Sequence, residues 1–190
     1  MDDQQTWQRA LRAIDDWHRG LSEECRTQLG ELIGRIMLLK EESLRLGLAA
    51  GSAEICRTCG GSCCRYGKYH VTILDLLAFR LNSIDPIANF DNFPFCPYGG
   101  DEGCLMPPRF RPLTCVIFNC DPIEERMGDD ACRSAATLEG ELREQIARAE
   151  RLTGRRLGRP VLLDYGAAET AGQIVESEIP LDKGCINGNH

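Results

Sequence analysis

The stretch CRTCGGSCC, residues 56–64, places four cysteines within nine positions. Two residues between the first pair let the backbone turn so that both thiolates reach one metal ion, and the Gly-Gly pair suits this turn because glycine tolerates a positive φ. Short regular spacing in a chain with no visible export signal is more typical of metal ligands than of disulfides. Four more cysteines follow by residue 120, so the predicted metal ligands are Cys56, Cys59, Cys63, Cys64, Cys96, Cys104, Cys115 and Cys120.

The adjacent pair Cys63 and Cys64 leaves the number of metal centres open. Neighbouring side chains diverge, so they rarely complete one tetrahedral zinc site together. The alternatives are two nearby centres, one polynuclear cluster, or one ligand beside a reactive thiol. Eight thiols are enough for two zinc sites of four cysteines, whereas one four-iron cluster uses four. Spacing alone does not choose between zinc and iron.

The sequence also suggests roles for the cations, the histidine, the tyrosines and the remaining cysteines. Zinc held by four thiolates has a net charge of about −2, which nearby cations would offset: Arg57, Arg65, Lys68, Arg109 and Arg111. With eight cysteines present, His70 is not needed as a ligand, and we predict an ordinary histidine, with a role behind the ligands or facing a substrate as the alternative. We expect Tyr66, Tyr69 and Tyr98 to pack around the metal core. The other cysteines of the eleven are predicted to be helix-packing residues (Cys25, Cys132) and a surface or tail thiol (Cys185).

Helical periodicity surrounds this central region. Apolar residues spaced by three and four predict a helical hairpin or one broken helix over residues 1–50, with a stripe from Cys25 to Met37 and with Lys40 on the wet side. Residues 51–121 are predicted to be loops and short strands around one helix, ILDLLAFRL, which Thr72 caps with Asp75 in the third helical position.

The remaining sequence predicts a long helix and an extension. Asp121 as N-cap and Pro122 as first residue start a helix over residues 122–156, which Gly154 would end. Gly128 and Gly140 would weaken or bend this helix, so two helices in line are the alternative. Residues 157–190 form the extension, with a short strand at 160–163. The expected fold is therefore mainly α: a helical N-terminal arm and a long C-terminal helix around a small, irregular, cysteine-rich, metal-centred core.

The cysteine pattern resembles the zinc- or iron-chelating cysteine-cluster family, the YkgJ-like group, which is marked by CxxCxxxCC. The matching second half is FCPYGGDEGCLMPPRFRPLTCVIFNC, which supplies Cys96, Pro97, Gly103, Cys104, Arg111, Pro112, Cys115, Phe118 and Cys120. The resemblance covers residues 56–120 and implies metal chelation, with the biochemical role of most members unassigned. The group looks related to flagellin lysine methylases, in which a similar motif is associated with an iron-sulfur cluster and methyl transfer.

Composition narrows the function further. The net charge is −7, and the 22 basic residues are scattered among 29 acidic ones, which argues against a nucleic-acid partner. No segment has the 18 or so apolar residues of a membrane span, so we expect a cytoplasmic protein. We predict a metal-binding protein of unassigned role, taking zinc or iron, with helices that offer a surface for a second copy or another protein. The alternatives are an iron-sulfur enzyme or redox protein in which a thiol such as Cys64 reacts, and metal storage or delivery.

Overall fold

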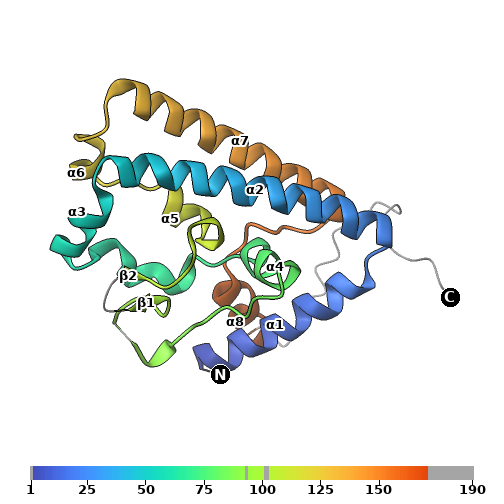
Figure 1. Ribbon diagram of the computed structural model, residues 1–190. Coiled ribbons are helices and arrows are strands. Elements are labelled where there is room, and N and C mark those ends of the chain that lie inside the picture. Colours follow the sequence, from blue (N-terminus) through green and yellow to red (C-terminus); the bar gives the residue numbers. More distant parts are fainter. Residues whose placement is uncertain (1, 93, 101–102, 171–190) are drawn as a thin grey trace.

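The computed structural model describes residues 2–92, 94–100 and 103–170 (Figure 1). The chain begins with a helical hairpin of α1 (Asp3–Gly20) and α2 (Glu23–Ala49). Asp2 caps α1 by accepting a hydrogen bond of 2.7 Å from the Gln5 amide, and Ser22 caps α2 by accepting one of 3.2 Å from the Cys25 amide. The predicted helical hairpin is thus confirmed, and capping at Ser22 explains where the second helix begins.

A single hydrophobic core joins this hairpin to the rest of the chain. Buried residues of α1 and α2, such as Trp7, Ile14 and Ile33, pack in one cluster with residues of α4 (Ile73–Leu81) and α7 (Asp129–Thr153). Figure 1 shows α7 running along α2, with α4 enclosed below α2 and above α1. Each of these helices buries apolar side chains against the others, so the mainly α fold is confirmed.

The capping box at Thr72 also places a buried ion pair. Thr72 Oγ1 accepts from the Asp75 amide, and Asp75 Oδ2 accepts from the Thr72 amide at 2.9 Å, as predicted for the start of α4. The other oxygen, Oδ1, lies 2.6 Å from Lys40 Nζ, and both side chains are only 1 % exposed. The prediction that Lys40 lies on the wet side of α2 is therefore wrong, because Asp75 supplies a buried partner from another helix.

The central region is irregular, as predicted. It contains α3 (Ser52–Cys59), the 3₁₀ helices η1 (Ser62–Tyr69), η2 (Phe90–Asn92) and η3 (Pro108–Phe110), and the short helix α5 (Leu113–Ile117). Strands β1 (Gly99–Gly100) and β2 (Gly103–Cys104) pair antiparallel, with Gly99 opposite Cys104. Residues 71–79 belong to the shared core, whereas Gly67 is the one buried residue of the segment 52–69. Apolar burial therefore anchors residues 71–79 in the core, whereas it contributes little to anchoring residues 52–69.

The C-terminal half differs from the prediction at the first N-cap and in the extension. Cys120, not Asp121, is the N-cap of α6 (Asp121–Glu124). Gly128 separates α6 from α7, in agreement with the alternative of two helices in line, and α7 ends before Gly154, whose φ is 63°. The predicted strand at 160–163 is wrong, because Val161–Thr170 forms α8, which packs on α1. At the start of the predicted strand, Pro160 forms an isolated antiparallel bridge with Thr72. Residues 171–190 of the extension lie outside the described residues.

Helix length and polarity also bear on the expected absence of a membrane span. Within the described residues, every helix is either too short or too polar to cross a bilayer.

Candidate metal centre

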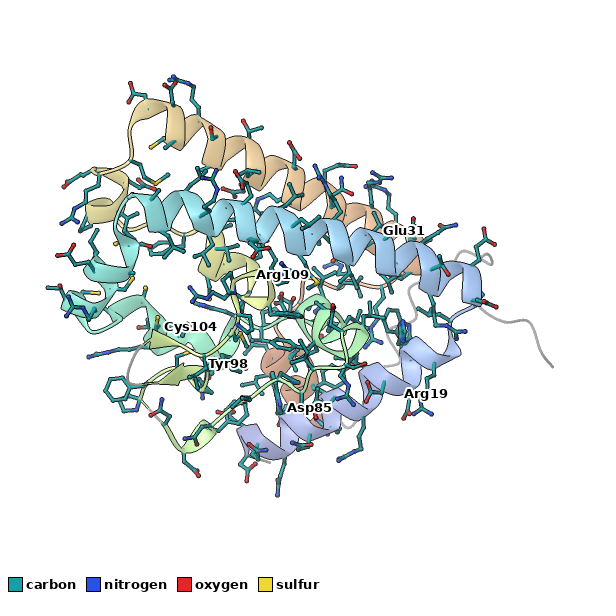
Figure 2. All side chains as sticks on the ribbon, viewed as in Figure 1. Arg19, Glu31, Asp85, Tyr98, Cys104 and Arg109 are labelled. Carbon is teal, nitrogen blue, oxygen red and sulfur yellow. The ribbon has the colours of Figure 1, made fainter. Side chains whose placement is uncertain are left out.

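The eight cysteines of the predicted pattern lie on elements grouped at one end of the molecule. These elements are α3, η1, the β1–β2 hairpin, α5 and the start of α6 (Figure 1). All eight are free thiols in the part of the chain that the structure describes. Figure 2 labels Cys104 next to Tyr98 within this region. Residues separated by up to 64 positions in sequence are thereby gathered in space, from Cys56 to Cys120.

A first group consists of Cys56, Cys59, Cys63 and Cys120. Two left-handed glycines, with φ values of 64° and 68°, end α3 directly after Cys59 and turn the chain into η1. Cys120 comes from α6, which contacts α3 and is tied to it by an ion pair of 3.8 Å between Arg126 and Glu54. Burial raises the pKa of Cys56, and negative charge on the other three thiols raises it further. The four sulfurs are therefore within electrostatic reach of one another.

A second group consists of Cys64, Cys96, Cys104 and Cys115. Cys96 lies shortly before β1, Cys104 is the last residue of β2, and Cys115 comes from α5. Burial raises the pKa of Cys115, followed by the charges of Cys104 and Cys96. Cys115 nevertheless has solvent-exposed surface, so the thiol is crowded by its neighbours without being closed off from water.

Cys64 is the member of the second group that lies next to the first. Burial raises its pKa to about 12, and charges on Cys63 and Cys96 add to this effect. Its thiol therefore stays protonated at neutral pH unless a cation compensates the charge. A thiol that stays protonated is a weak nucleophile, because the thiolate is the reactive form.

A histidine that the sequence prediction did not assign to the site contacts the second group. His70 Nδ1 lies 3.3 Å from Cys115 Sγ. Burial lowers the pKa of His70, so the imidazole is neutral near pH 7 and can donate its ring N–H to a thiolate. The contact is compatible with both expectations, an ordinary hydrogen-bonded histidine and a residue that supports the ligands. Its signal in the sequence is the spacing from Cys64, which equals two turns of a 3₁₀ helix.

Two more residues, Gly67 and Tyr98, lie against the second group of cysteines. A Cβ added at Gly67 would overlap with Cys96 Sγ and would lie 3.1 Å from Cys96 Cβ, so only glycine lets that sulfur approach η1 so closely. Tyr98 is 2 % exposed, and its hydroxyl has no hydrogen-bond partner among the described residues. Burial raises the pKa of Tyr98, followed by charge on Cys96. The phenol is therefore a protonated donor placed near thiols that would accept from it as thiolates.

The residues fit a metal ion in chemistry, but their sulfurs are not preassembled. Within residues 2–92, 94–100 and 103–170, no three His, Cys, Asp or Glu side chains are arranged so that they could hold an ion. Binding therefore requires cysteine side chains to rotate within each group. The soft thiolates would suit zinc, iron or an iron-sulfur cluster, and a buried, uncapped phenol would suit the sulfur acceptors that such a centre provides.

The other predicted residues divide between confirmed and corrected positions. Cys25 is buried in the core as predicted, whereas Cys132 is exposed, so its prediction as a packing residue is wrong. Tyr66 is 69 % exposed and does not pack around the cysteines. Cys185 lies outside the described residues.

The predicted cations are used in different ways. Lys68 pairs with Asp3 at 2.7 Å and Arg109 pairs with Glu41 at 2.9 Å, so both bind carboxylates of the N-terminal hairpin. The charge of Arg111 lowers the pKa of Cys56, which partly offsets burial there. Of these three, Arg111 is the cation that acts on a candidate ligand.

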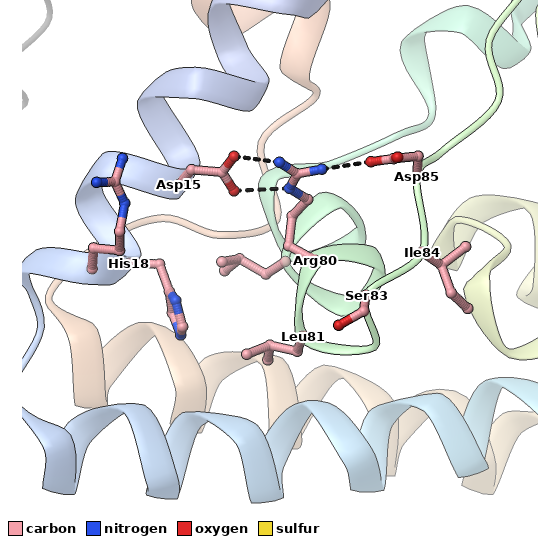
Figure 3. A pocket seen from close by; sticks show the side chains of 9 residues that line it. Asp15, His18, Arg80, Leu81, Ser83, Ile84 and Asp85 are labelled. Carbon is pink, nitrogen blue, oxygen red and sulfur yellow. Dashed lines mark hydrogen bonds and ion pairs between the residues drawn. The ribbon is translucent and has the colours of Figure 1, made fainter.

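A separate hollow of about 430 Å³ lies between α1 and α4. Figure 3 shows Arg80 reaching across its edge, with contacts of 2.9 and 2.5 Å to Asp15 and 2.7 Å to Asp85. These two carboxylates already satisfy the guanidinium, so its charge is not presented to a ligand. Neighbouring His18 has a buried Nε2 without a hydrogen-bond partner in the described part of the chain. We assign this hollow no chemistry.

His18 should make the fold sensitive to acid. Its pKa is lowered by burial and then by the charge of Arg26, against an opposing effect of Asp15. The unfolded chain therefore binds more protons below its histidine pKa of about 6.5, and the free energy of unfolding should fall as the pH drops through this value. Urea unfolding at about pH 7.5 and about pH 5.5 should show a smaller fall in His18→Gln than in the wild type. An equal fall in both proteins would contradict the assignment.

Comparison with known proteins adds no relative to this description. No family model matches the chain, and neither a curated protein nor a solved structure does. The resemblance to the cysteine-cluster family thus rests on the motif alone, and a functional assignment rests on the site.

Proposed function

We propose that this protein binds metal, zinc or iron, through its eight clustered cysteines, and that it belongs to the zinc- or iron-chelating cysteine-cluster family. The observation that carries the proposal is the gathering of eight free thiols from five elements into two neighbouring groups. Their charges raise one another's pKa where they lie closest. A bound cation would turn this mutual repulsion into attraction.

The segment that carries four of these cysteines gives independent support. Residues 52–69 form α3 and η1, yet Gly67 is the one residue there that is buried. Apolar burial therefore contributes little to holding the segment against the rest of the protein. Metal-thiolate bonds would supply that contribution, as they do in small domains that fold only with their metal.

The roles follow from this assignment. The cysteines would be ligands as thiolates, and a metal would lower their pKa and release their protons on binding. Tyr98 and His70 would donate hydrogen bonds to ligand sulfur, which stabilises its charge. Free thiols at this density persist in a reducing compartment, so we place this function in the cytoplasm. We place no reactive thiol at Cys64, because burial and its neighbours raise its pKa.

Metal analysis of the full chain tests the proposal. After anaerobic purification, elemental analysis should find zinc or iron in the wild type and in Cys132→Ser, a control that removes an exposed cysteine outside both groups. Cys59→Ser and Cys96→Ser should each lower the metal content. A colourless protein with zinc supports a metal-binding module, and a brown protein with acid-labile sulfide supports an iron-sulfur centre. Wild-type protein that neither retains metal nor takes it up after reduction would contradict the proposal.

A further inference from the structure

One face of η1 is marked by a repeat of three. The residues Gly61, Cys64, Gly67 and His70 are spaced by three positions, and a 3₁₀ helix has three residues per turn. Hydrogen bonds of this type hold both ends, from the Cys64 amide to the Gly61 carbonyl at 2.8 Å and from the His70 amide to the Gly67 carbonyl at 3.1 Å. These four residues therefore lie above one another on the same face. Cys63 lies on a different face, about 120° away.

The marked face of η1 meets the second group of cysteines. At Gly67 the missing side chain leaves the space that Cys96 Sγ occupies. At His70 the imidazole lies 3.3 Å from Cys115 Sγ. Cys104 joins these sulfurs from the hairpin, because its strand pairs with Gly99, whose amide bonds the Cys96 carbonyl at 2.9 Å. Cys64 thus shares its face of the helix with the positions that contact two other members of its group.

Cys63 is grouped with the cysteines of α3 and α6. The turn after α3 brings the chain back on itself, because the Gly61 amide donates to the Cys56 carbonyl at 3.1 Å and Ser62 Oγ donates to the Cys59 carbonyl at 3.2 Å. Cys63 follows this turn directly. Cys120 reaches the same place from α6, which the Arg126–Glu54 pair holds against α3.

We infer that η1 divides the eight cysteines into two metal centres of four thiolates each, with the adjacent pair Cys63 and Cys64 split between them. The first centre is held by Cys56, Cys59, Cys63 and Cys120, and the second by Cys64, Cys96, Cys104 and Cys115. This inference rests on the proposed function and goes beyond it, because it fixes the number of centres and the ligands of each. It also explains the doubled cysteine: two residues about 120° apart on a narrow helix serve two neighbouring ions, and the hydrogen bond that joins their thiols gives way to two metal-sulfur bonds.

Cadmium-113 tests the division, because each ¹¹³Cd²⁺ ion bound by four thiolates gives its own NMR signal. Cadmium added to the metal-free, reduced full chain should give two signals and a stoichiometry of two. Cys63→Ser should lose the same signal as Cys59→Ser, and Cys64→Ser should lose the same signal as Cys96→Ser. Each of these variants should keep the other signal, which also shows that the protein is still folded.

Other outcomes overturn the inference in recognisable ways. Loss of the same signal in Cys63→Ser and Cys64→Ser, or loss of all signals in every variant, would show a shared cluster and would leave the proposed function standing. A wild type that binds no cadmium, and no zinc or iron either, would overturn the proposed function itself. The three results are distinct, so the failure of one idea is not mistaken for that of the other.

A variant that keeps all eight thiols gives a second, independent check. Gly67→Ala places a Cβ where Cys96 Sγ lies, so it should weaken cadmium binding at least tenfold at the second centre and leave the first unchanged. The matched control is Gly34→Ala on α2, where an added Cβ meets open space, and both signals should persist. Equal effects of Gly67→Ala on both signals would contradict the division.

Discussion

Replacing Lys40 with alanine is expected to lower the free energy of unfolding by about 3–5 kcal/mol. The ammonium and the Asp75 carboxylate are 2.6 Å apart and are each 1 % exposed. Removing the cation leaves a carboxylate in the core that is shielded from water and has lost its charge partner. Urea unfolding of the full chain, followed by circular dichroism under one fixed metal and redox condition, measures the loss.

Two further variants show whether burial is the cause. Arg45→Ala removes a cation from the same helix, but its partner Glu42 is exposed, so we expect little change in the free energy of unfolding. In Lys40→Met with Asp75→Asn both charges are absent, and this double variant should be more stable than Lys40→Ala alone. The amide oxygen that the second substitution introduces is also able to accept one of the hydrogen bonds from Thr72. A Lys40→Ala protein as stable as Arg45→Ala would contradict this account.

The same ion pair shows what the sequence could and could not predict. Periodicity predicted α1 and α2 because apolar residues recur every three or four positions. Lys40 continues that spacing from Ile33, Ile36 and Met37, but its charge suggested a solvated position. Its burial depends on Asp75, 35 residues later, and on a cap that orients the carboxylate. A single helix pattern contains no information on such a partner.

Helix α8 and the grouping of the cysteines could not be predicted from the sequence for related reasons. The apolar run after Pro160 is too short for its period to separate a strand from a helix, and contact with α1 decides for the helix. All eight candidate ligands could be named from spacing, yet their grouping depends on the period of three in η1 and on the glycine that admits Cys96. The contact of His70 with Cys115 could not be predicted, because it depends on the same period.

Metal removal is expected to release the segment 52–69 and to leave the hydrophobic core in place. This segment buries one glycine, whereas residues 71–79 are packed against α1 and α2 in the shared core. A structural zinc ion contributes about 10–16 kcal/mol in small zinc-dependent folds, far more than this segment obtains from burial. The effect is therefore confined to one part of the cysteine-rich region 51–121.

Hydrogen exchange read by mass spectrometry locates the effect. After chelation under reducing conditions, amides of α3 and η1 should exchange at least tenfold faster, while those of α2 and α4 should keep their protection. Cys132→Ser should respond to chelation as the wild type does, since its thiol is exposed and outside both groups. Unchanged protection of residues 52–69 would show that contacts other than metal-thiolate bonds hold the segment, because its own burial is too small to do so.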